Sequence, residues 1–93
     1  MAAKLPTTIT KENLGSLTLI IAYFDGTVSS NDIDDDDTWA SGIKSIVGWP
    51  IVQTTVDGPQ DCTIDAVDYA TGDITFASAA SQTAYVYVLC RNM

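Results

Sequence analysis

Residues 16–24 decide the fold, and they read Ser-Leu-Thr-Leu-Ile-Ile-Ala-Tyr-Phe. In an extended strand, successive side chains point to opposite faces. Both faces of this stretch are apolar: Leu17, Leu19, Ile21 and Tyr23 share one face, and Ile20, Ala22 and Phe24 share the other. A strand that is apolar on both faces lies at the centre of a sheet and is covered on both sides, or its outer face meets another chain.

Short strand-like segments follow, separated by turn residues such as Asp25-Gly26. Residues 39–48 have apolar side chains at helical spacing, but their two glycines favour a strand near residues 43–47, with a short helical turn as the alternative. The other predicted strands are residues 51–56, 62–68, 74–76 and 83–90, with 7–10 as a short strand or an extended arm. This pattern predicts an all-β fold, namely a small antiparallel β-sandwich or jelly-roll-like barrel of about six to seven short strands.

The 93 residues are the length of one domain. We expect residues 1–15 to form an N-terminal arm or first short strand. Residues 16–93 are expected to form a single β-sandwich domain with an exposed acidic loop at residues 27–38. The N-terminus lacks the apolar segment of a secretory signal. The longest apolar run, residues 17–24, is far shorter than the ~20 residues of a membrane-spanning helix, so no membrane association is expected.

Charge is unevenly distributed along the chain. Twelve Asp and Glu face four Lys and Arg, and the net charge is -8. This balance disfavours nucleic-acid binding, because such binding draws its affinity from basic side chains on phosphates. Five of the acids lie in residues 32–37, so the rest of the chain is only mildly acidic. Lys4, Lys11 and Arg91 lie near the chain ends, so if the two ends meet, that side is a less acidic pole opposite the aspartate loop, residues 32–37.

The aspartate loop is the strongest candidate for a metal site, because clustered carboxylates are the ligands that calcium prefers. Asp32, Asp34 and Asp36 have the spacing of the first three ligands of an EF-hand loop. In that register, however, Asp37 stands where glycine is required and Ile43 stands where the bidentate glutamate belongs. We therefore favour a solvated loop kept extended by charge repulsion, with those three aspartates as weaker metal candidates.

No arrangement of catalytic residues emerges from the sequence. The chain has no histidine to act as a base for a serine or cysteine nucleophile, and it has no glycine-rich phosphate loop. We therefore expect no enzymatic activity and no cofactor. Cys62 and Cys90 are expected to be buried free thiols, and a disulfide between neighbouring strands is the alternative.

Four apolar residues are candidates for contact with another chain. Trp39 follows the aspartate loop and Trp49 precedes a proline, and tryptophan is enriched at protein interfaces. Leu5 and Ile9 lie in the N-terminal segment, which is either a frayed end or an arm that becomes ordered on a partner.

Several segments of the second half resemble small structural proteins of tailed bacteriophages, including phages of cyanobacteria. The resemblance covers roughly residues 40–90 and follows the order strand, turn, Thr-Gly-x-Ile-Thr-Phe and terminal Tyr/Val strand. It is carried by residues 43–48, 63–67, 70–76 and 85–89. It implies a virion protein, most directly a decoration (cement) protein on the outer surface of the capsid. No functional residue can be transferred, because no defining motif is present.

The implied partner is the major capsid protein or another virion protein. Decoration proteins of this kind are small β-rich domains that often form trimers or dimers, synthesised in the host cytoplasm and located on the capsid surface. Two alternatives remain open. The chain could serve elsewhere on the virion, in a head fibre, neck or tail. It could also be a soluble β module that binds calcium through residues 32–37 and a carbohydrate near Trp39.

Overall fold

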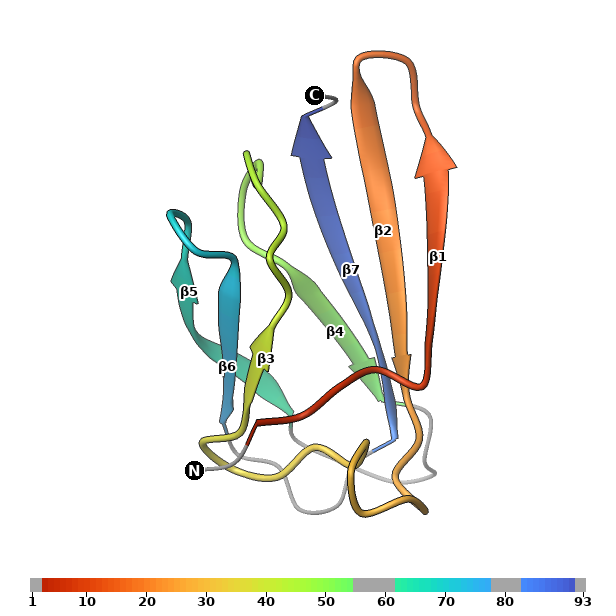
Figure 1. The fold of residues 1–93 in the computed structure, drawn as a ribbon, viewed down its shortest axis with the longest axis vertical. Coiled ribbons are helices and arrows are strands. Elements are labelled where there is room, and N and C mark those ends of the chain that lie inside the picture. The colour runs from red at the N-terminus through yellow and green to blue at the C-terminus, as the bar shows by residue number, and fades with distance from the viewer. Residues whose placement is uncertain (1–2, 55–61, 78–82, 92–93) are drawn as a thin grey trace.

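The computed structural model describes residues 3–54, 62–77 and 83–91, and this part of the chain contains strands and no helix. The strands form two antiparallel sheets, of order β1-β2-β7-β4 and β3-β6-β5 (Figure 1). This arrangement confirms the predicted all-β sandwich. The strands are β1 Thr8–Asn13, β2 Leu17–Phe24, β3 Thr38–Ala40, β4 Ile51–Thr54, β5 Thr63–Asp68, β6 Asp73–Ala77 and β7 Ala84–Arg91.

The apolar strand β2 lies inside the four-stranded sheet, as predicted, between β1 and β7. β1 pairs with β2 along its whole length, so residues 8–13 are an integral strand of this sheet. The inner face of β2 carries Ile20, Ala22 and Phe24, all buried. Its outer face is only half-buried. One face of this strand is therefore covered by its own chain, and the other lacks a described covering strand.

The core lies between the two sheets and is built around three aromatic rings. The Phe24 ring meets those of Trp39 and Phe76 edge to face, with centroids 5.5 and 5.7 Å apart. Such edge-to-face pairs add to the free energy gained by removing the rings from water. The aliphatic remainder of the core comes from β2, β6 and β7 and from one loop residue, Ile33.

The prediction of a strand near residues 43–47 is wrong, because the structure has no strand between β3 and β4 in this part of the chain. Only Ile46 makes an isolated bridge, to Cys90, and the Val47 N–H donates to the Leu89 carbonyl at 2.7 Å. The physical reason is backbone conformation, because Gly42, Ser45 and Gly48 all have positive φ angles. Those angles interrupt an extended strand. A short strand, β3, instead begins at Thr38, where the sequence suggested the end of a loop.

Candidate functional site

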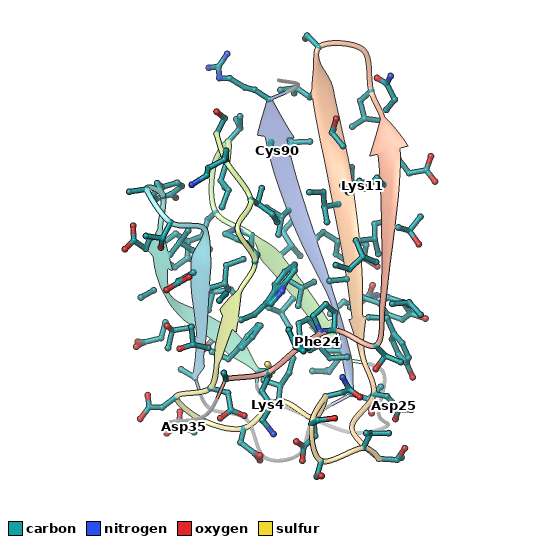
Figure 2. All side chains as sticks on the ribbon, in the orientation of Figure 1. Lys4, Lys11, Phe24, Asp25, Asp35 and Cys90 are labelled. Carbon is teal, nitrogen blue, oxygen red and sulfur yellow. The ribbon has the colours of Figure 1, made fainter. Side chains whose placement is uncertain are left out.

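Lys4 is bound inside the aspartate loop (Figure 2). Its ammonium donates a hydrogen bond to Asp32 Oδ1 and another, of 2.8 Å, to the Ser29 carbonyl. It also lies 3.6 Å from Asp37 Oδ2 and 3.9 Å from Asp34 Oδ2. The hydrogen bond to Asp32 raises the pKa of Lys4, and the negative charges of the three aspartates add to this effect against the opposing effect of burial. The loop therefore contains its own cation.

The aspartate loop is more buried and more ordered than the sequence suggested. Asp35 and Asp36 are exposed, but Ile33 and Asp37 are buried, so the expectation of an exposed loop over residues 27–38 is wrong at these last two residues. Asp37 Oδ2 accepts the Asp34 N–H at 2.9 Å, and the Asp37 carbonyl accepts the Phe76 N–H at 2.8 Å. Ile33 draws the loop into the core, and Lys4 offsets the charge repulsion that would otherwise extend it.

The geometry disfavours a calcium site in this loop. Of the three weaker metal candidates, Asp32 and Asp34 lie beside Lys4, but the third carboxylate beside it is Asp37 and not Asp36. In residues 3–54, 62–77 and 83–91, no group of three or more metal-ligating side chains is placed to hold a metal ion. An ammonium group occupies the position between the carboxylates that a cation would need.

Lys4 also holds the N-terminal segment in place. Its N–H donates to the Thr38 carbonyl at 2.9 Å, and the Leu5 carbonyl accepts the Asn31 side-chain amide at 2.6 Å. Ala3 makes a parallel bridge to Thr38. Residues 3–5 are therefore tied to the loop and to β3, and they are not a frayed end.

The four residues predicted to contact another chain differ in how far they are exposed to solvent. Leu5, Ile9 and Trp49 are exposed, with 66%, 50% and 55% of their surface accessible. Trp39 is only 3% exposed, so its assignment as an interface residue is wrong. It follows a charged loop in sequence, but its indole packs on Phe24 between the sheets.

The strand register shows which side chains share the outer face of the four-stranded sheet. Directly paired residues of neighbouring strands lie on the same face. The register therefore places one side chain from each strand in two cross-strand rows, Thr8-Tyr23-Tyr85-Gln53 and Thr10-Ile21-Tyr87-Ile51. Leu19 and Leu89 extend the apolar surface toward one end of the sheet.

Aromatic contacts organise this outer face. The rings of Tyr23 and Tyr85 lie 5.0 Å apart, and the Tyr87 hydroxyl donates to Gln53 Oε1 at 2.9 Å. Ile51 is 64% exposed at the edge of the face. The core lies on the opposite side of the sheet, where β2 and β7 present their buried residues. Sequence reasoning identified the apolar outer face of β2, but not its continuation across β7 and β4.

The two cysteines are free thiols, as favoured from the sequence, but only Cys90 is buried as expected and Cys62 is half-buried. Burial raises the pKa of Cys62 to about 11, so this thiol is neutral and weakly nucleophilic near pH 7. No helix in the described part of the chain is long and apolar enough to cross a membrane. No protein-family model, curated protein or solved structure matches the chain.

Proposed function

We propose that this protein is a non-enzymatic virion structural protein that binds the outer surface of a phage capsid and stabilises the shell. The observation that supports it best is the apolar outer face of the four-stranded sheet. Its cross-strand rows contain Ile21, Tyr23, Tyr85 and Tyr87, with Ile51 at the edge. Tyrosine and aliphatic side chains on a sheet face that no described strand covers are suited to contact with another protein surface.

The area of this outer face limits how tightly a single copy of the protein could bind. Four strands of up to eight residues give a face of about 500 Å² from the usual strand spacing and rise. A stable two-protein interface buries about 800 Å² on each partner. One copy would thus bind weakly, and a homodimer or homotrimer on a repeating lattice would gain affinity from several simultaneous contacts.

Binding of this kind explains how a small protein can stabilise a shell. A protein that binds the assembled lattice better than its separate subunits shifts the equilibrium toward the assembled state. The major capsid protein is the proposed partner. The net charge of -8 would limit self-aggregation of free copies before attachment. The virion assignment itself rests on the resemblance of residues 40–90, and a head fibre, neck or tail position is the alternative within it.

The test is co-sedimentation of the purified protein with phage particles that lack it. We expect the wild-type protein to migrate with the particles on a density gradient. The variant Ile51→Asp places a charge on the outer face and should reduce binding at least tenfold. Val28→Asp is the matched control, because Val28 is 41% exposed but lies in the loop after β2.

Point variants are preferable to truncation here. Deleting residues 1–12 would remove Lys4 and most of β1, so loss of binding would report loss of folding. If the wild-type protein neither binds particles nor self-associates, the proposed function is wrong. If the Ile51→Asp variant binds like wild type, attachment does not use the outer face. Binding only to isolated tails, with none to capsids, would favour the tail alternative.

A further inference from the structure

The inner side of the four-stranded sheet contains a pocket that the proposed attachment does not use. β1, β2 and β7 reach farther toward one end of the molecule than β3, β5 and β6 (Figure 1). At that end the sheet is faced by residues 41–44 instead of by a strand. The space between them is a half-open pocket of about 290 Å³.

The register shows which side chains of β1 face this pocket. Ile9 pairs with Ala22 and Lys11 pairs with Ile20, and both partners belong to the buried inner face of β2. Ile9 and Lys11 therefore lie on the inner side as well, where no described strand of the second sheet covers them. Figure 2 shows Lys11 and Cys90 on the same part of the sheet, away from Lys4.

The floor of the pocket is apolar. Ile20, Trp39 and Cys90 line it and are at least nine-tenths buried, and Ile43 adds a half-buried wall. A pocket of about 290 Å³ lies near the lower end of the range for small-molecule sites. It can therefore admit a small apolar ligand of about ten non-hydrogen atoms, with the Trp39 indole beneath it.

The rim of the pocket is cationic in a strongly acidic chain. Lys11 and Lys44 line it, and among residues 3–54, 62–77 and 83–91 no Asp or Glu does. In the described residues neither lysine makes an ion pair; the ion pairs found there all belong to Lys4. Arg91 also borders the pocket, but it pairs with Leu17 on the outer face of the sheet. Its side chain therefore belongs to the outer face, and the two lysines are the cations of the pocket.

An apolar floor beneath two lysines selects an apolar molecule that carries an anionic group at one end. We propose that this pocket binds a small apolar carboxylate, whose hydrocarbon part rests on Trp39 and Ile20 and whose carboxylate meets Lys11 and Lys44. Charge-assisted contacts orient the ligand, and burial of its apolar part supplies most of the affinity. Ligand size and solvent-exposed lysines together lead us to expect a Kd of about 0.1–1 mM.

The probe is 3-phenylpropanoate, and the reporter is the fluorescence of Trp39 in a Trp49→Phe background. Trp49 is exposed and does not line the pocket, so its removal isolates the buried indole. We expect saturable binding of 3-phenylpropanoate and at least fivefold weaker binding of the neutral 3-phenylpropanamide. Lys11→Met and Lys44→Met should each weaken carboxylate binding about fivefold, and Lys11→Arg should retain it, because the charge is kept.

Three results would overturn the proposal. The first is equal affinity for the carboxylate and the amide. The second is unchanged carboxylate binding in the Lys11→Met, Lys44→Met double variant, provided that its melting temperature matches wild type. The third is binding of an acetylated tripeptide ending in phenylalanine more than tenfold tighter than 3-phenylpropanoate, because that would assign the pocket to the end of a partner chain. None of these measurements involves phage particles, so this proposal and the attachment proposal can fail separately.

Discussion

The ammonium nitrogen of Lys4 lies 3.6 Å from Asp37 Oδ2, and the two side chains are only 9% and 5% exposed. Residues 33 positions apart in sequence thus share a site that is nearly excluded from water. A buried ion pair of this kind contributes little net stability compared with an apolar pair, because both charges lose their hydration. Removing one partner is far more costly, since the remaining charge stays buried without compensation.

Lys4→Met should therefore destabilise the protein by about 3–5 kcal/mol, measured as the free energy of unfolding in urea. The methionine keeps most of the side-chain volume and removes the charge. Lys11→Met is the control, because Lys11 is exposed and makes no ion pair in the described residues, and it should change stability by less than about 0.5 kcal/mol.

A double-mutant cycle tests whether Asp37 is the relevant partner. Asp37→Asn should cost less in the Lys4→Met background than in wild type, because the aspartate is no longer needed to balance a buried cation. Asparagine also keeps an oxygen that can accept the Asp34 N–H. Equal costs in the two backgrounds would show that the two side chains do not interact energetically.

Stability at high pH should reflect the raised pKa of Lys4. Below its ordinary value of 10.5 the lysine is charged in both the folded and the unfolded chain, so its contribution to stability is fully present. As the pH rises above 10.5, the unfolded lysine loses its proton first and the contribution is lost through the higher pKa of the folded state. The stability difference between wild type and Lys4→Met should therefore be constant from pH 7 to 10 and shrink above 10.5.

Gly72→Ala should be strongly destabilising, by about 2–4 kcal/mol. Gly72 has a φ of 85°, and a Cβ added there would lie 2.6 Å from the Ile43 backbone nitrogen and 2.7 Å from its carbonyl oxygen. Those atoms are backbone and cannot move aside cheaply. Gly15→Ala is a matched control, since its φ is 86° but a Cβ there would meet nothing within 4 Å, so it should cost only about 1–2 kcal/mol.

Both glycine variants are measured by urea unfolding. A loss of stability at Gly72 no greater than at Gly15 would contradict the close approach of Gly72 to the Ile43 backbone.

The contact between Gly72 and Ile43 also affects the pocket, because Ile43 lines it. The Ser41 hydroxyl donates to the Gly72 carbonyl and accepts the Ile43 N–H at 3.1 Å. The turn before β6 thus holds one wall of the pocket, and Gly72→Ala should weaken 3-phenylpropanoate binding as well.

Cys62 should react slowly with iodoacetamide. With a pKa of about 11 against an ordinary 9.0, its thiolate fraction at pH 8 is about a hundredfold lower than that of an unperturbed thiol. The rate at Cys62, followed by mass spectrometry of its peptide, should rise with pH to a midpoint near 11. A midpoint near that of a free cysteine peptide would show that partial burial does not perturb this thiol in solution.

Local sequence predicted the elements whose pattern is strong over many residues. The run from Leu17 to Phe24 was placed correctly as an inner strand, and the turn at residues 70–73 leads into β6 as expected. The segment at 43–47 was mispredicted, because the positive φ of Ser45 is a non-glycine conformation that composition does not indicate. The charged residues before Trp39 indicate a loop edge, and they give no sign that Trp39 is the buried residue of strand β3.

The all-β class, the inner position of β2 and the location of the acidic charge follow from the sequence, because alternation and composition are properties of adjacent residues. What those charges contact depends on the tertiary structure. Lys4 reaches Asp32 and Asp37 because residues 3–5 run beside β3, and Lys11 and Lys44 border one pocket because the two sheets differ in extent. Such pairings depend on strand register and sheet packing, which bring together residues that no local pattern connects.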